Sequence, residues 1–167
     1  MPGAVVGTFV EATVNVLAIM ADVGVTVQAA DDGAAGRRTS DVSAIVGFGG
    51  ELAGGLVLAL PQATAGRLAE AFAGQPVGTE GDEDFVDAVG ELANMIAGGA
   101  KKQLHTLTGR RAVLTTPTVI LGGHCVARPT GTPRVTLPCT SAAGPFSLEV
   151  SVSETGSIEP GSTDAAR

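Results

Sequence analysis

The sequence contains no tryptophan, no tyrosine and only five phenylalanines among its 167 residues. A core must therefore be built from valine, leucine, isoleucine and alanine, and this length is enough for one domain that buries a real core. Basic residues are also scarce, since ten Lys and Arg face 17 Asp and Glu for a formal net charge of −7. Lys101-Lys102 and Arg110-Arg111 are only pairs, whereas a nucleic-acid binder carries a basic stripe, so we expect no nucleic-acid partner.

Cysteines and long apolar runs are equally sparse. Cys125 and Cys139 are the two cysteines of the chain, which is more typical of reduced thiols than of a secreted domain held by disulfides. We expect no signal peptide and no apolar span of 18 residues. The sequence therefore predicts a cytoplasmic protein with no membrane contact.

Motifs for common cofactors are missing as well. The glycine-rich segment 47–50 precedes a predicted strand, whereas a nucleotide-binding loop must open a helix, so we interpret it as part of a hairpin. His124, Cys125 and Cys139 match no zinc spacing. No Ser-His-Asp pattern or nucleophile elbow supports covalent catalysis. We therefore expect no metal site and no cofactor of the protein's own.

What the sequence does contain is one long helical pattern over residues 82–107, with Asp82 or Thr79 as its N-cap. Its apolar residues form one stripe at helical spacing: Phe85, Val89, Leu92, Ala93, Ile96, Ala100 and Leu104. Asp87, Glu91 and Asn94 lie within about 60° of one another on the opposite side. One face therefore packs, while the other displays two carboxylates and a carboxamide.

The remaining elements suggest a repeated unit. Further helices are predicted over 5–21, where the apolar stripe includes Met20, and over 62–72, just after Pro61. Strands are predicted from β-branched runs over 23–29, 42–48, 55–60, 117–121, 134–139 and 146–152, with a turn over 49–54 and loops over 31–39 and 122–133. A helix followed by three strands thus occurs twice, which favours an α+β fold with one antiparallel-rich sheet and helices on a face. We expect a single domain over 1–152 and a disordered tail over 153–167.

The polar helix face alone would be interpreted as an ordinary solvated surface. A longer sequence pattern that includes its residues favours a functional role instead. Asp87-x3-Glu91-x2-Asn94-x22-Pro117 resembles the signature of the CheC/CheX/FliY family of chemotaxis phosphatases. The flanking segments 88–104 and 117–122 and the N-terminal segment 9–20 are similar to the CheX branch. The resemblance covers roughly residues 5–152.

The resemblance implies a CheC-like α/β sandwich of two pseudo-symmetric halves, each a helix and three strands. It implies hydrolysis of the aspartyl phosphate on a CheY-like response regulator, which would hold its own Mg²⁺. Glu91 and Asn94 would be the catalytic residues, and Asp87 and Pro117 would have structural or supporting roles. Gly98 is not part of the signature, but a bare helix surface beside Asn94 would let a docking partner approach closely. CheX members carry one site per chain and form dimers, so a homodimer is also implied.

The chemistry of these residue types suits that activity. An aspartyl phosphate is already reactive, so positioning supplies most of the rate. Asn94 offers a donor and an acceptor that can orient a water, and Glu91 can form a charge-assisted pair with a lysine of the regulator. The small residues Gly90, Ala97 and Gly98 would leave space for that partner.

A second site in the first half finds no support. Aligning Asn15 with Asn94 leaves no carboxylate at the position of Glu91, and aligning Glu11 with Glu91 leaves no carboxamide at the position of Asn94.

Two alternatives to a phosphatase stay open. The helix could dock a response regulator or a flagellar partner without catalysis. An unrelated enzyme is disfavoured, because the nearest histidine on that helix, His105, lies three turns beyond Asn94.

Overall fold

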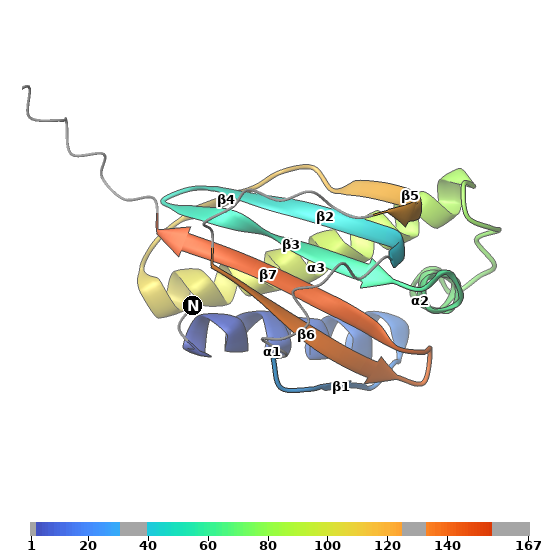
Figure 1. Cartoon of the computed structure of the whole chain (residues 1–167), viewed down its shortest axis with the longest axis horizontal. Helices are drawn as coiled ribbons and strands as arrows, with labels where there is room; N and C mark the ends of the chain where they lie inside the picture. Colours follow the sequence, from blue (N-terminus) through green and yellow to red (C-terminus); the bar gives the residue numbers. More distant parts are fainter. Residues whose placement is uncertain (1–2, 31–39, 125–132, 155–167) are drawn as a thin grey trace, which may run out of the picture.

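Three helices cover one face of a seven-stranded sheet in the computed structural model, which describes residues 3–30, 40–124 and 133–154 (Figure 1). The helices are α1 (Gly3–Ala21), α2 (Gln62–Ala73) and α3 (Glu83–Thr108). The strands are β1 (Val25–Val27), β2 (Ser40–Gly50), β3 (Leu52–Leu60), β4 (Ala112–Leu114), β5 (Thr118–His124), β6 (Arg134–Ser141) and β7 (Phe146–Glu154). The predicted α+β class is therefore confirmed.

The sheet has the internal symmetry that the repeated pattern predicted. Its order is β1-β6-β7-β3-β2-β4, with β5 also paired to β2, and every pairing is antiparallel. Exchanging β1, β2 and β3 for β5, β6 and β7 reproduces that order. The two halves therefore meet where β3 pairs with β7 in the middle of the sheet, and β4 is an addition to the second half.

α3 is the central helix of the layer. All seven residues of its predicted apolar stripe are buried. α3 contacts both other helices and the strands β2, β3, β4 and β5. On β2, the alternating residues Val42, Ala44 and Val46 are fully buried, and Phe48 meets the ring of Phe9 from α1 edge-on at 5.6 Å. The core thus lies between the helices and this face of the sheet.

Several predicted boundaries are wrong. The turn expected over 49–54 is strand except for Glu51, and the short strand β4 was missed. The strand expected over 23–29 is reduced to β1, whereas β5 extends to His124, into the expected loop. β7 extends to Glu154, beyond the expected start of the tail. The loop 31–39, the remainder of the second loop and the tail from residue 155 lie outside the described residues.

α1 corrects two expectations. Met20 was predicted to face the core, yet its side chain is 40% exposed, because the buried stripe runs through Phe9, Thr13 and Leu17 to Ala21. The expectation of no long apolar span was also wrong. Among the described residues, α1 is the one helix long and apolar enough to cross a membrane by length and composition. Its buried stripe packs against α3, as the stripe of a core helix does.

Candidate functional site

The polar face of α3 brings together the three residues that the sequence placed there. Asp87 and Glu91 are exposed and Asn94 is half-buried. The amide nitrogen Nδ2 of Asn94 donates a hydrogen bond of 3.4 Å to Oε2 of Glu91. This contact turns the amide nitrogen toward Glu91 and leaves the carbonyl oxygen Oδ1 as the acceptor available to a water.

Both ends of α3 are well defined. Asp82 is the N-cap residue, as predicted, but its side chain does not cap the helix. Its carboxylate oxygen Oδ2 instead accepts hydrogen bonds from Thr79, three residues earlier, from the backbone N–H at 2.6 Å and from the hydroxyl Oγ1 at 3.2 Å. At the other end Gly109 adopts a left-handed conformation with φ of 72°, and its N–H donates to the carbonyl oxygen of His105 at 2.8 Å. α3 therefore begins and ends at defined residues on either side of its polar face.

Pro117 reaches this helix although it lies 23 positions beyond Asn94. A Cβ atom on Gly90 would lie 3.9 Å from Pro117 and 3.4 Å from Cγ2 of Val119. Gly90 immediately precedes Glu91, so the start of β5 rests against the turn of helix that carries the site. Between Asn94 and Pro117 the chain completes α3, forms β4 and comes back to the helix turn that carries Glu91. The spacing in the sequence is the length of chain that this path needs.

The segment that carries Pro117 is itself anchored to the sheet. The backbone N–H of Thr115 donates to the carbonyl oxygen of Gly47 at 3.0 Å, and the N–H of Gly47 donates to Thr115 Oγ1 at 2.9 Å. These two bonds tie the connection between β4 and β5 to β2. Pro117 therefore supports the helix rather than moving freely beside it.

The small residues of α3 have different surroundings from those predicted. Gly90 and Ala97 are buried within the fold, so they leave no space for a partner. Gly99 lies against α1, where an added Cβ would come 3.2 Å from Cβ of Ala12. Gly98 has no atom within 4 Å of the position its Cβ would take, so it alone of these residues leaves open surface beside Asn94.

Other chemistry-bearing residues are placed away from this face or are already engaged. Nδ1 of His105 lies 3.1 Å from the carbonyl oxygen of Arg110, at the end of the helix. Cys139 is a buried free thiol on β6, and burial raises its pKa to about 11, which makes it a poor nucleophile. In residues 3–30, 40–124 and 133–154 no three His, Cys, Asp or Glu side chains group as metal ligands do. Cys125 lies outside the described residues.

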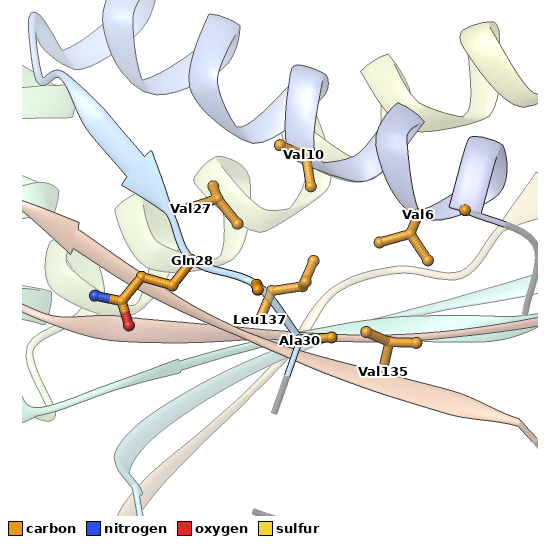
Figure 2. A pocket seen from close by; sticks show the side chains of 9 residues that line it. Val6, Val10, Val27, Gln28, Ala30, Val135 and Leu137 are labelled. Atoms are coloured by element: carbon orange, nitrogen blue, oxygen red, sulfur yellow. The ribbon is translucent and has the colours of Figure 1, made fainter. Parts of the chain in front are cut away.

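A hollow between α1 and the edge of the sheet carries no comparable chemistry. It lies between α1, the segment after β1 and β6, and Figure 2 shows the valines Val6, Val10, Val27 and Val135 around it. Gln28 is the one polar side chain among its lining residues. The face of α3 with Asp87, Glu91 and Asn94 is therefore the candidate site.

A known protein family covers the part of the chain that carries the candidate site. The family model described as "Chemotaxis phosphatase CheX" matches residues 42–140, more than half of the chain and the part that includes α3 and Pro117. The chain belongs to the CheX family. No curated protein sequence matches the chain.

Solved structures show the same fold. A CheX chemotaxis protein from Desulfovibrio desulfuricans is 29% identical, with a TM-score of 0.78, over 89% of this chain and 99% of that one. A CheC-like superfamily protein from Shewanella is 26% identical, with a TM-score of 0.81, over 92% and 99% of the two chains. A CheX from Borrelia burgdorferi, solved as a complex with CheY, BeF3 and Mg²⁺, is 22% identical with a TM-score of 0.74, over 89% and 97% of the chains. At that last identity the likeness concerns the fold alone.

Proposed function

We propose that this CheX-family protein hydrolyses the aspartyl phosphate of a CheY-like response regulator, and that the polar face of α3 is its active site. The observation that carries the proposal is the pair of Glu91 and Asn94, joined by a hydrogen bond on an open helix face that Pro117 supports. The Borrelia CheX bound to CheY, BeF3 and Mg²⁺ supports a partner of this class.

The proposed step needs a positioned water and little else. The water oxygen attacks phosphorus in line as the bond from phosphorus to the aspartyl oxygen breaks. The aspartate leaves as a carboxylate, and the proton of the water passes to the released phosphate. Asn94 Oδ1 accepts a hydrogen bond from that water and holds it behind the phosphorus. An amide is too weak a base to take the proton, so the gain is one of orientation.

Glu91 would position the partner. Its carboxylate is exposed, so it can form a charge-assisted pair with a cationic side chain of the regulator. The bond from Asn94 to Glu91 aligns the amide before the partner arrives. Asp87 and Gly98 would border the docked regulator, and Pro117 would hold the helix in place. The Mg²⁺ belongs to the regulator, and the phosphatase brings no cofactor of its own.

We also propose that the protein works in the cytoplasm as a homodimer. The sheet ends at β1 on one side and at β4 and β5 on the other. Such edge strands have backbone groups that a second chain can cover.

The direct test is phosphate release from a panel of CheY-like regulators phosphorylated with acetyl phosphate, followed with and without this protein. We expect faster loss of the phosphoryl group from at least one regulator. Binding of a regulator without faster release would instead indicate the non-catalytic docking module.

Glu91→Gln tests the recognition role. Glutamine keeps an oxygen for the Asn94 amide but removes the charge, so association with the phosphorylated regulator should weaken about tenfold and become less sensitive to salt. Glu91→Lys should weaken it further. The matched control is Glu83→Gln, which makes the same change at an exposed position in the first turn of α3. Equal affinities of Glu91→Gln and Glu83→Gln in a titration would remove Glu91 from the interface.

Asn15→Ala tests the single-site interpretation. Asn15 and Glu11 are both exposed on α1, but they are four residues apart, whereas Glu91 and Asn94 are three apart. We therefore expect Asn15→Ala to retain most of the phosphatase activity, with any loss confined to stability or dimer assembly. Turnover and circular dichroism measured side by side would check this. A folded Asn15→Ala protein as inactive as Asn94→Ala would mean that the chain has two working sites.

A further inference from the structure

Lys101 and Lys102 are the only lysines of the chain, and they are adjacent on α3. Both are exposed. Within the described residues, neither side chain forms a hydrogen bond or an ion pair with another group. An acidic protein with a net charge of −7 thus presents an unpaired positive pair on its central helix.

This lysine pair lies on the same face as the proposed active site. Lys101 follows Asn94 by seven residues, which places it about 10 Å further along the helix and within roughly 20° of the same direction. Gly98 lies between the two residues and has open space above it. From its start to its end, the face therefore presents Asp87 and Glu91, then the Asn94 amide, a bare stretch, and the lysine pair.

The exposed face of α3 is therefore negatively charged near its start and positively charged near its end. The chain as a whole is acidic, with a net charge of −7, so carboxylates of an approaching regulator are repelled over most of its surface. Lys101 and Lys102 reduce that repulsion beside Asn94 itself. Opposite charges at the two ends of the face also distinguish one orientation of the partner from the reverse.

We propose that Lys101 and Lys102 form a second docking contact, which binds carboxylates of the response regulator about two helical turns from the phosphoaspartate. Together with Glu91, they determine the direction in which the regulator lies along α3, and so which regulators are substrates. The inference rests on the proposed function of the α3 face. It deepens that proposal by specifying the partner: a regulator with a cation on one side of its phosphorylation site and an acidic patch on the other.

The test compares two variants of equal net charge. Lys101→Gln with Lys102→Gln removes two positive charges, and Arg134→Glu changes the charge by the same amount at an exposed position on β6, so both proteins carry −9 instead of −7. Glutamine is nearly as good a helix former as lysine, which protects the fold. With a regulator phosphorylated by acetyl phosphate in low salt, we expect the double lysine variant to raise KM about fivefold and to leave kcat within twofold. Arg134→Glu should leave both values within twofold, and 0.5 M NaCl should remove the difference.

Other outcomes would overturn the proposal. Equal KM values for the two variants would show that only net charge matters. A changed dimerisation constant in light scattering with an unchanged KM would show that the lysine pair faces a second copy of this chain. Reversal of an acidic residue on the regulator should weaken binding to the wild type but not to the lysine variant, and equal losses would exclude a direct contact.

The failure of the phosphatase proposal is distinguishable from the failure of this one. Binding of the regulator loaded with beryllium fluoride and Mg²⁺ can be measured whether or not phosphate is released. If the wild type binds without hydrolysis and the lysine variant binds about fivefold more weakly, the phosphatase proposal fails and the docking contact stands. If hydrolysis is normal in both proteins at every regulator concentration, the docking contact fails.

Discussion

Replacing Asn94 with alanine should reduce the turnover of phosphorylated regulator by roughly 100- to 1000-fold while the protein stays folded. Of Asp87, Glu91 and Asn94, the amide is the one side chain that can accept a hydrogen bond from a water and donate one to a neighbour at the same time. Without it the water still reaches the phosphorus but is no longer held in line. The measurement is phosphate release at saturating regulator concentration.

The fold should tolerate this change for reasons visible at the site. Asn94 is half-buried, and its side-chain hydrogen bond to Glu91 is long and exposed at 3.4 Å. Alanine is also the best helix former. Binding of the regulator loaded with beryllium fluoride should therefore change by less than about threefold, which separates catalysis from docking. Turnover within twofold of the wild type would refute the role of Asn94.

The sequence was most informative about α3. A stripe of seven apolar residues over an uninterrupted helix has few alternative interpretations, so its buried face and its polar face were both predicted correctly. The same period placed Asp87, Glu91 and Asn94 together without knowledge of the fold. Helical spacing alone is thus enough to bring together the members of a candidate site when they share one helix.

Pro117 shows where that reasoning stops. No periodicity connects residue 117 with residue 90, because the chain between them ends a helix, forms the three-residue strand β4 and turns into β5. A strand of three residues has too little pattern to be recognised, and β4 was missed. The position of Pro117 near Gly90 depends on long-range pairing of β2 with β4 and β5, and only the family resemblance suggested that Pro117 mattered.

Glycines were the other difficulty. The sequence does not distinguish Gly90, Gly98 and Gly99 from one another. In the structure Gly90 lies against β5, Gly98 is open and Gly99 lies against α1. A glycine does not reveal whether its missing side chain makes room for the protein's own core or for a partner. Similarly, the glycines around the β2–β3 hairpin indicated a wide turn, whereas both strands continue through them.

Among the glycines that the structure describes, Gly54 is the one whose replacement should affect stability most. It lies in β3, where its Cα pairs with Phe48 of β2 on one side and with Val152 of β7 on the other. Its φ of 148° is outside the range that residues with a side chain adopt readily. An added Cβ would overlap the carbonyl oxygen of Ser151 and lie 2.7 Å from its carbonyl carbon and 3.0 Å from Cα of Val152.

Gly54→Ala should therefore lower the free energy of unfolding by about 3 kcal/mol or more, and Tm by roughly 10 °C. The atoms in the way are backbone atoms of β7, so they cannot rotate aside as a side chain would. Relief requires β3 and β7 to separate, and this is the pairing that joins the two pseudo-symmetric halves. Thermal unfolding followed by circular dichroism is the measurement.

Gly66→Ala is the matched control for this prediction. Gly66 lies within α2, and nothing is within 4 Å of the position its Cβ would take. The same added methyl group should there stabilise the helix by up to about 1 kcal/mol and raise Tm by a few degrees. If Gly54→Ala were as stable as the wild type, β7 could not follow the path against β3 seen here, and the central join of the two halves would be wrong. Because Gly54 is outside the α3 face, the molecules of Gly54→Ala that remain folded should still release phosphate at the wild-type rate.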